Sequence, residues 1–492
     1  MLTIESFRLH SAEARLLMNK YQIGRVEGRW KNFSPPIQGG KFRPYIEGVS
    51  KDMDGEVEEA STSDSFRELS STFDAKDPAV SQRRSDVINR SPSRSPSSSV
   101  EANKPPEGLS YLDARTRELI DLDLAKYPPL DAATQDHIVY KYRLLNDRIR
   151  AEGLYDCNYW AYAIEFCRCS FLLSLMFLCL QCGWYGASGL FMGCLWHQAS
   201  FVVHDAGHMG ITHSFTIDTV IGIIIADFIG GLSLGWWKHS HNVHHIVTNS
   251  PEHDPDNQHM PFLAPSHRFL ESLYSTYHER MLVFGNLAKF LVPYQAYLYY
   301  PLLTLGRFNL YVQSWTYLVR GLGPKKGPAW WTRWLEIAGN VFFWIWFGYG
   351  IIYESIPTAW DRFTFIMVSH LITMPLHVQI TLSHFAMSTA DLGPQESFPQ
   401  KMLRTTMDVE CPQWLDFFHG GLQFQAIHHL YPRIPRHNLR ATQKLVQEFC
   451  AEVGIPYALL GFVDGNKEVI GKLGEVGRQA AILARCRNEI AI

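Results

Sequence analysis

Four apolar stretches, each close to the length of a membrane-spanning helix, constrain this chain of 492 residues more than any other feature. They cover residues 169–185, 187–203, 337–353 and 363–387. A helix needs about 20 apolar residues to cross the hydrocarbon of a bilayer. In that medium only helices and closed barrels satisfy the hydrogen bonds of their own backbone. We therefore predict an all-α integral membrane protein with four transmembrane helices.

Three histidine-rich clusters stand next to these stretches. They are His204-Asp205-Ala206-Gly207-His208, His241-Asn242-Val243-His244-His245 and Gln425-Ala426-Ile427-His428-His429. Spacings of one, three or four residues place imidazoles on one face of a helix. Imidazole binds zinc, copper, iron and nickel alike, so the ligands alone do not name the metal. A mononuclear zinc site usually has four ligands, and seven candidate histidines therefore predict two metal ions.

The predicted topology brings the histidine clusters to one side of the membrane. Lys and Arg gather before, between and after the two pairs of apolar stretches, which places both termini and the central segment in the cytosol. The apolar stretch 215–237 is predicted to be re-entrant or interfacial, because a crossing would separate two clusters by about 30 Å. The stretch 282–318, interrupted by prolines and polar residues, is predicted to lie in the headgroup zone. Together these segments predict a cytosolic cap that carries the histidine clusters.

Three further histidines recur every seven residues in the last apolar stretch, at His370, His377 and His384, and share one helix face. The helix runs towards the cytosol, so His384 lies at the depth of the clusters and His370 about 21 Å deeper. We predict His384 as an eighth ligand. His370 and His377 are predicted to be paired interior polar groups near the substrate path.

Several charged residues near the clusters have two interpretations each. Asp205 and the run His253-Asp254-Pro255-Asp256 are candidates for holding ligand imidazoles through their free N–H groups, with turn formation and helix capping as the alternative. Arg433 and Arg436 are candidates for contacting a lipid headgroup or a redox partner, with a plain interfacial anchor as the alternative.

Composition and residue type limit the class of function. A formal net charge of −3 gives no electrostatic reason to expect nucleic acid as a partner. Nine scattered cysteines and the absence of a cleavable signal pattern fit a reducing, cytosol-facing context. A single histidine at a membrane edge often caps a helix, but three clusters on one face favour a metal site. A metal transporter is the rival class, and it would need ligands along a transmembrane path.

The chain resembles the membrane fatty-acid desaturases, in particular the front-end group with a fused cytochrome b5 domain, over about residues 113–461. The three clusters are its most specific marks, the third within Phe424-Gln425-Ala426-Ile427-His428-His429-Leu430-Tyr431-Pro432. The resemblance implies that Gln425 replaces a histidine as a ligand or near-ligand. The order Ala426-Ile427 lacks the usual acidic residue. Further segments are similar to fungal sphingolipid delta-8 desaturases, namely 236–238, 254–261, 307–311 and 383–387.

The resemblance implies a di-iron enzyme that uses dioxygen and two electrons to introduce a trans double bond into the sphingoid base of a ceramide. An unactivated methylene has no acidic proton, so its oxidation requires redox chemistry at a metal. The implied partners are cytochrome b5 and its NADH-dependent reductase, at the endoplasmic reticulum membrane with the site facing the cytosol. A front-end acyl-lipid fatty-acid desaturase and a lipid hydroxylase are the alternatives within the class. A catalytically silent lipid-binding remnant is the alternative from another class.

Composition and resemblance together divide the chain into five parts. Residues 1–48 resemble the tail of a cytochrome b5 domain, with His10 at its second haem ligand. The His-Pro-Gly-Gly element and the first haem ligand are absent, so haem is expected only where an intact cytochrome b5 domain is supplied. Residues 49–110 are predicted to be a disordered linker. The remaining parts are predicted to be cytosolic amphipathic helices (111–165), a membrane desaturase domain (166–465) and a C-terminal tail (466–492).

Overall fold

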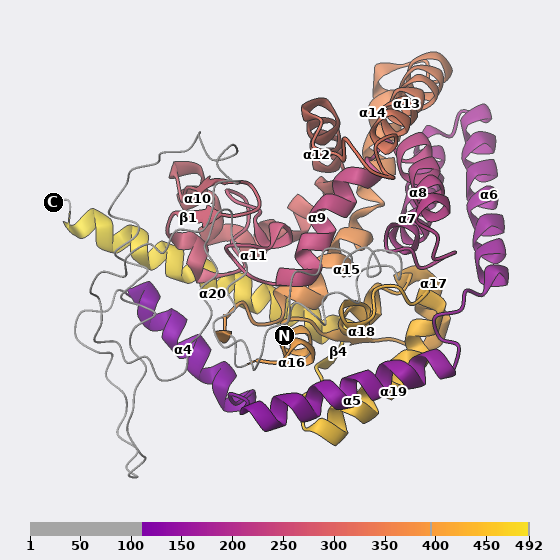
Figure 1. Ribbon diagram of the computed structural model, residues 1–492. Coiled ribbons are helices and arrows are strands. Elements are labelled where there is room, and N and C mark those ends of the chain that lie inside the picture. The colour runs from indigo at the N-terminus through magenta and orange to yellow at the C-terminus, as the bar shows by residue number, and fades with distance from the viewer. Residues whose placement is uncertain (1–110, 394–395, 491–492) are drawn as a thin grey trace, which may run out of the picture. The chain divides into compact units, whose positions relative to one another are not determined.

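The computed structural model describes residues 111–393 and 396–490, with side chains as far as residue 486. All described residues belong to one unit. The predicted linker and the cytochrome b5-like segment with His10 lie outside the described residues. Helices dominate the described part, as Figure 1 shows.

Most helices are short, and the strands form two small pairs. The paired strands are β1 with β2, antiparallel, and β3 with β4, parallel. Two π-helical segments, η2 (Ile224–Ile229) and η6 (Trp344–Ser355), continue α8 and α13. In chain order the helices and strands are α4 (Tyr111–Lys126), α5 (Ala132–Ala151), α6 (Tyr159–Gln181), α7 (Tyr185–Gly207), α8 (Phe215–Ile223), α9 (Leu234–Val247), β1 (Leu273–Ser275), β2 (Arg280–Leu282), α10 (Asn286–Leu291), α11 (Gln295–Thr304), α12 (Gly306–Arg320), α13 (Thr332–Phe343), α14 (Ala359–Leu371), α15 (Met374–Phe385), α16 (Phe398–Thr405), β3 (Asp408–Glu410), α17 (Asp416–His419), α18 (Gln425–Leu430), α19 (Leu439–Val453), β4 (Leu459–Gly461) and α20 (Phe462–Ile490).

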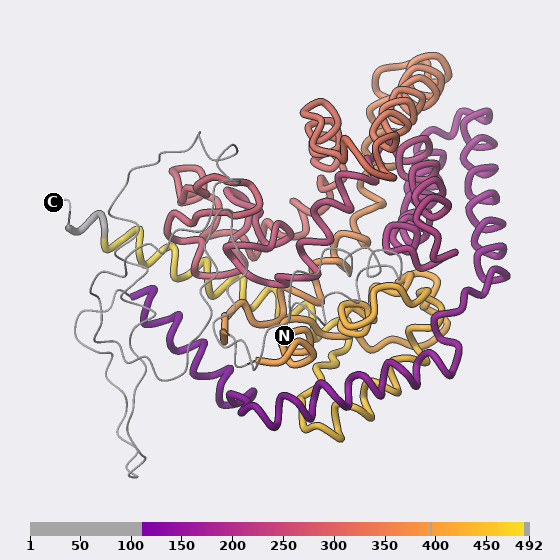
Figure 2. Tube along the Cα trace, in the orientation of Figure 1, coloured from indigo at the N-terminus to yellow at the C-terminus, as the bar shows by residue number. Residues whose placement is uncertain are grey.

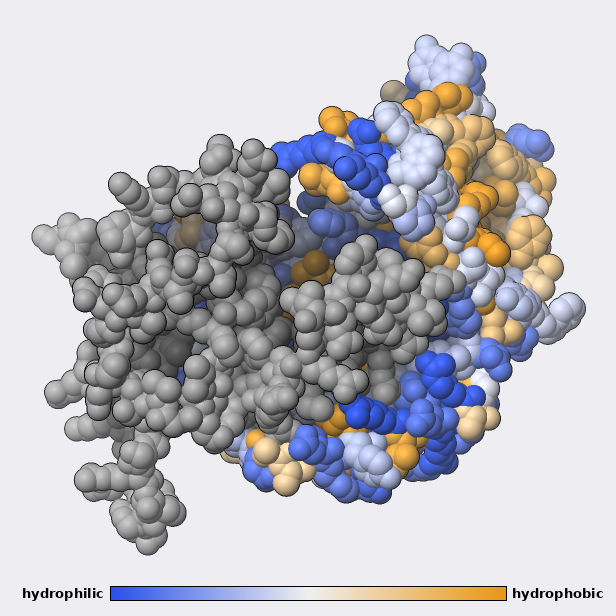
Figure 3. Space-filling view, in the orientation of Figure 1, coloured by the Kyte–Doolittle hydropathy of each residue, from blue (hydrophilic) through white to orange (hydrophobic). Residues whose placement is uncertain are grey.

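Three helical segments of the described chain are long and apolar enough to cross a membrane: Tyr159–Gln181, Thr332–Ser355 and Ala359–Phe385. On α6, Phe166 and Phe171 are 73% and 63% exposed, as expected of side chains that face lipid. Figure 3 shows hydrophobic residues gathered at the upper right, over the region of α6, α13 and α14. Hydrophilic residues cover its lower edge, over α5 and α19. This distribution supports a multi-pass membrane protein.

The boundaries of the first two predicted spans were wrong. Helix α6 begins at Tyr159, ten residues earlier than predicted, because Asn158 caps it by accepting the Trp160 backbone N–H at 3.1 Å. Helix α6 ends at Gln181 and α7 begins at Tyr185, so the chain turns at residues 182–184, inside the first predicted stretch. Gly183 makes this tight turn with a φ of +73°.

Helix α7 packs closely against α6 and α14. A Cβ atom at Gly193 would lie 2.6 Å from the Ser369 carbonyl oxygen, and one at Gly189 would lie 2.8 Å from that of Phe365. Small residues of this kind let helix backbones approach one another inside membranes. α7 is not among the three segments that are long and apolar enough to cross a membrane, and many of its residues are buried against other helices. Whether it crosses the bilayer stays a prediction.

The apolar stretch predicted to be re-entrant forms a sharply bent pair of helices. The segment Phe215–Ile229 and helix α9 meet at 117°. Buried carboxylates satisfy the backbone at the bend: Glu336 accepts the Gly235 N–H at 2.9 Å, and Asp227 accepts the Leu234 N–H at 3.3 Å. Arg307 donates to the Gly230 carbonyl at 2.6 Å. A broken helix at membrane depth needs such partners, so this geometry supports the re-entrant interpretation.

The stretch 282–318 is occupied mainly by the short helices α10, α11 and α12, and its place in the headgroup zone stays a prediction. Pro293 lies in a 3-10 turn between α10 and α11, whereas Pro301 lies inside α11. α12 contains Arg307 and Asn309 without interruption. The buried Arg307 is accommodated because it donates to the Tyr311 hydroxyl of the same helix and to the Gly230 carbonyl.

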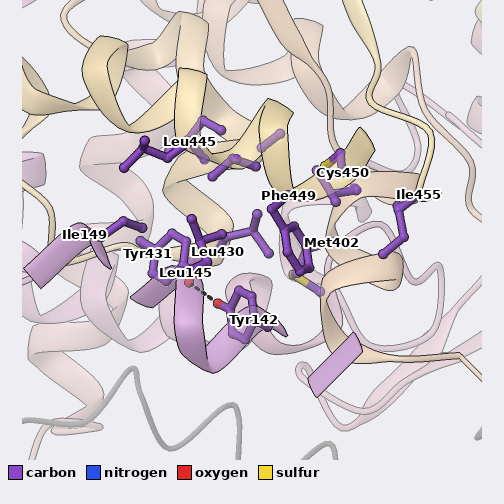
Figure 4. Packing of buried hydrophobic residues seen from close by; sticks show 14 of the residues in the cluster. Tyr142, Leu145, Ile149, Met402, Leu430, Tyr431, Leu445, Phe449, Cys450 and Ile455 are labelled. Carbon is purple, nitrogen blue, oxygen red and sulfur yellow. Dashed lines mark hydrogen bonds between the residues drawn. The ribbon is translucent and has the colours of Figure 1, made fainter. Parts of the chain in front are cut away.

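A hydrophobic core joins the N-terminal helix α5 to the C-terminal part of the chain. Figure 2 shows α5 running beside α19, which lies more than 280 residues later in the sequence. Figure 4 shows Tyr142 of α5 in this core, where its hydroxyl donates to the Leu430 carbonyl at 2.8 Å. Its ring stacks on Tyr431 at a centroid distance of 5.3 Å. Leu430 and Tyr431 directly follow the third histidine cluster, so the core fixes α18 in place.

The residues predicted to form a C-terminal tail belong instead to the long helix α20. Its side chains Val469 and Leu473 are buried at 0% and 1% exposure. α20 packs against α11 and α15. It is therefore part of the folded unit that surrounds the histidine clusters.

Candidate metal centre

Four helices from distant parts of the sequence bring the predicted ligands together. His204 lies in the last turn of α7, and His208 follows directly after that helix. α9 carries the second cluster, α15 carries His384, and α18 carries the third cluster. In Figure 1, α9, α15 and α18 approach one another near the centre of the described unit. The residues brought together are His204, His208, His241, His244, His245, His384, Gln425, His428 and His429.

The imidazoles form two groups with the spacing of metal ligands. In the first, one nitrogen each of His204, His208, His241 and His428 lies within 4.8 Å of the others. In the second, nitrogens of His244, His384 and His429 lie within the same limit. Each group thus combines residues from three separate elements. Two adjacent groups fit the predicted pair of metal ions.

His245 lies between the two groups. Its ring centroid is 4.7 Å from that of His208 in the first group and 4.2 Å from that of His429 in the second. Its Nε2 is 3.1 Å from Nε2 of His241. A ligand in this position can serve either metal ion.

Several buried imidazole nitrogens have no hydrogen-bond partner among the described residues. They are Nε2 of His208, Nδ1 of His245, Nδ1 of His384, Nε2 of His428 and Nε2 of His429. A buried polar atom without a partner costs about 1–3 kcal/mol. Metal ions bound by these lone pairs would remove this cost, so the residues present fit a metal centre.

Electrostatics also favour metal binding at the third cluster. Burial and the neighbouring imidazoles lower the pKa of His428 and that of His429 well below the ordinary value for histidine. Both rings are therefore neutral at physiological pH. A neutral imidazole has a free lone pair, which is the form that binds a metal.

Neighbouring side chains orient the ligands. The Asp254 carboxylate is 2.9 and 3.0 Å from Nδ1 of His244, as predicted, which leaves Nε2 for a metal. The hydroxyl of Thr248 is 3.1 Å from Nδ1 of His429. Asp408 accepts the Ala426 backbone N–H at 2.8 Å, at the start of the helix that carries the third cluster. The roles of Thr248 and Asp408 were not predicted, because both residues lie outside the clusters in sequence.

Asp256 extends the possible ligand set. One of its oxygens, with nitrogens of His241 and His244, forms a further group within 4.8 Å. His241 Nδ1 lies 3.8 Å from the Asp256 carboxylate. Asp256 is 33% exposed at its side chain, so an orienting role alone also fits its position.

The predictions for Asp205 and Arg436 were wrong. Asp205 contacts no ligand imidazole among its recorded hydrogen bonds; it accepts from the Tyr162 hydroxyl and from Arg436 Nη1, each at 2.5 Å. Arg436 is buried and also pairs with Glu165, so it is not free to contact a headgroup or a redox partner. The pairing joins the helix of the first cluster to the segment after the third. Charges this far apart in sequence gave no signal of their contact.

The remaining candidate residues are Gln425, His370 and His377. Gln425 is buried, and its side chain hydrogen-bonds His384, which fits a near-ligand. His370 is not paired with His377; its Nε2 lies 3.3 Å from the Tyr311 hydroxyl and its Nδ1 lies 2.8 Å from the Ile366 carbonyl. His377 belongs to neither group.

Fold and site together define a multi-pass membrane protein with a polyhistidine centre that is compatible with metal binding. The chain belongs to the fatty acid desaturase family, whose sequence model matches residues 183–461. It is 61% identical to the Delta 8-(E)-sphingolipid desaturase of Emericella nidulans, over 99% of this chain and 88% of that protein. It is 44% identical to the enzyme of the same name from Candida albicans, over 98% and 88% of the two chains. The Delta(8)-fatty-acid desaturase of Helianthus annuus is 37% identical over 70% and 74%.

Proposed function

We propose that this protein is a delta-8 sphingolipid desaturase that introduces a trans double bond into the sphingoid base of a ceramide. The proposed lipid substrate is based on the identity of 61% with the Emericella nidulans enzyme over nearly the whole chain. The proposed chemistry is based on the two adjacent histidine groups. Two hydrogen atoms leave the lipid and, with two electrons and two protons from a donor, reduce dioxygen to two water molecules.

The centre is proposed to hold two iron ions. His204, His208, His241 and His428 would hold one, and His244, His384 and His429 the other, with His245 between them and Gln425 as a ligand or near-ligand. Iron bound here would supply the dioxygen-dependent oxidation that an unactivated methylene requires. The chain itself would position the lipid and exclude water, since most of these imidazoles are fully or nearly fully buried.

The proposed setting is the endoplasmic reticulum membrane, with four transmembrane helices and the metal centre in a cap on the cytosolic side. Cytochrome b5 and its NADH-dependent reductase are the proposed electron donors. Residues 1–48 are proposed to be a cytochrome b5-like remnant with His10 at a haem-ligand position, 49–110 a linker, 111–165 cytosolic helices, and 166–465 the desaturase domain.

A host that lacks sphingolipid unsaturation tests this function. Expression of the full chain should produce ceramides with a trans double bond at the delta-8 position, detected by lipid mass spectrometry. His244→Ala and His428→Ala should abolish product and lower bound iron together. His137→Ala, at an exposed histidine of α5, is the matched control and should change neither.

The lipid products also separate the alternatives. The Acyl-lipid (9-3)-desaturase of Borago officinalis, 38% identical over 60% of this chain, favours acyl-chain desaturation as the second candidate. A double bond in the acyl chain would support that candidate, and added oxygen without unsaturation would support a hydroxylase. If the protein binds iron but forms no lipid product, the two desaturase candidates and the hydroxylase are all contradicted. That result would favour a catalytically silent lipid-binding protein.

A further inference from the structure

A second set of polar side chains, the inner polar cluster, lies apart from the proposed metal ligands. It consists of His197 on α7, Gln379 on α15, and His419 at the end of α17. Gln379 Nε2 is 3.1 Å from Nδ1 of His419. The ring of His197 stacks on Phe418, the residue before His419, at a centroid distance of 5.1 Å. These contacts make one site from three helices.

Two atoms of the inner polar cluster are buried and have no hydrogen-bond partner among the described residues. They are His197 Nε2 and Gln379 Oε1. His197 and Gln379 are only 5% and 3% exposed, so bulk water does not satisfy them. Leaving such groups unpaired is costly, and the cost is removed by a ligand that both donates and accepts hydrogen bonds.

A large apolar cavity of about 790 Å³ adjoins the inner polar cluster. Gln379 belongs to both, because its side chain also lines the cavity. The cavity reaches the surface at Val463, which is 64% exposed. A space of this size and character fits a hydrocarbon chain. Its apolar lining residues include Met374, Pro375, Val378, Phe418, Phe462 and Ile470.

One residue of the inner polar cluster is in register with a proposed metal ligand. His197 precedes His204 by seven residues on the continuous helix α7. Seven residues are nearly two turns, so the two histidines share one helix face at a separation of about 10.5 Å. A chain of several methylene groups can span this distance.

We infer that the inner polar cluster binds the amide and hydroxyl groups of a two-chain amide lipid, with its acyl chain in the apolar cavity and its other chain directed at the metal centre. This assignment rests on the proposed function and names residues that select its substrate. The opposite orientation, with a terminal methyl group in the inner polar cluster, would leave the two buried atoms unpaired. The fixed separation would also set the oxidised position by its distance from the polar end of the lipid.

Photolabelling tests where the acyl chain lies, independently of turnover. The probe is a ceramide with a diazirine at the end of its N-acyl chain, added to the purified full chain in detergent. The label should fall on α15 and α20, at residues such as Met374, Phe462 or Ile470, and excess natural ceramide should compete. Labelling confined to other helices would overturn the inference. If the probe labels the cavity but the protein makes no desaturated product, the proposed function is refuted and the inference about the binding site is not.

A substitution tests the polar contacts. Gln379→Leu keeps the side-chain volume close to the original and removes the amide, so KM for ceramide should rise about tenfold. The double bond should also appear at more than one position, while bound iron stays unchanged. Unchanged KM and product position in an iron-loaded variant would overturn the inference.

A second pair of variants tests the cavity without altering a buried residue. Val463→Trp should fill the cavity mouth and lower turnover of long-chain ceramide relative to N-acetyl ceramide by about tenfold. Glu468→Trp places the same ring on an exposed position of α20 outside the cavity and is the matched control. An equal effect of both variants on this ratio would contradict the assignment of the cavity to the acyl chain.

Discussion

Asp254 orients the ring of His244 through the nitrogen that is not the proposed ligand: its two carboxylate oxygens lie 2.9 and 3.0 Å from the imidazole Nδ1. The carboxylate is fully buried, and it also accepts the Asn249 backbone N–H at 2.7 Å, which fixes its own position. The proposed ligand nitrogen Nε2 therefore faces the other imidazoles of its group. Asp254 follows His244 by ten residues, and the chain turns back after the end of α9 to bring the two side chains together.

Asp254→Asn should weaken metal binding. The carboxylate charge orients His244 and makes its imidazole more basic, and the substitution removes that charge. Loss of such a partner typically costs about 10–100-fold in metal affinity. The measurement is iron retained per chain during titration with a chelator. Asp147→Asn, at an exposed position of α5, should retain iron as the unchanged protein does. Equal retention by the Asp254 and Asp147 variants would show that this carboxylate does not support a ligand.

Glu336→Leu should destabilise the bend that leads into α9. Glu336 Oε2 accepts from the Ser233 hydroxyl at 2.5 Å and from the Gly235 N–H at 2.9 Å, and both donors would lose their partner. An unsatisfied buried donor costs about 1–3 kcal/mol. We expect a lower Tm in detergent and less bound iron, because α9 carries the second histidine cluster. Glu271→Leu, on an exposed residue, is the control, and a comparable fall in its Tm would argue against a special role for the bend.

Gly193→Ala should disturb the contact between α7 and α14. The added methyl group would lie 2.6 Å from the Ser369 carbonyl oxygen and 2.7 Å from Cβ of Ile372. Overpacking of this kind usually costs about 1–3 kcal/mol. Gly186→Ala on the same helix is the matched control, since its nearest contact would be an ordinary 3.7 Å. Thermal unfolding should separate the two variants, and equal Tm values would contradict the close packing.

Free cysteines allow a test of the proposed orientation. Cys182 is exposed in the turn between α6 and α7, and Cys486 is exposed near the end of α20. If the C-terminus faces the cytosol, an impermeant maleimide should label Cys486 in intact, outward-facing microsomes. Cys182 should react only after the membrane is permeabilised. Variants that retain one of the two cysteines make the comparison direct, and the reverse pattern would invert the proposed topology.

The sequence predicted the meeting of the histidine clusters better than the packing around them. Histidine spacing and the need for one membrane face were enough to place His204, His244, His384 and His428 in one region. The partners of Asp205 and Glu336 were missed, because buried ion pairs and helix caps are formed by residues far apart in the chain. The position of the turn before α7 was also missed, since the left-handed conformation of Gly183 is not indicated by the apolar pattern.

X-ray anomalous scattering at the iron edge, from the intact protein loaded with iron, tests the central claim most directly. Two peaks are expected, one among His204, His208, His241 and His428, and the other among His244, His384 and His429. A single peak, or peaks outside the space between α7, α9, α15 and α18, would contradict a di-iron centre assembled from the three histidine clusters.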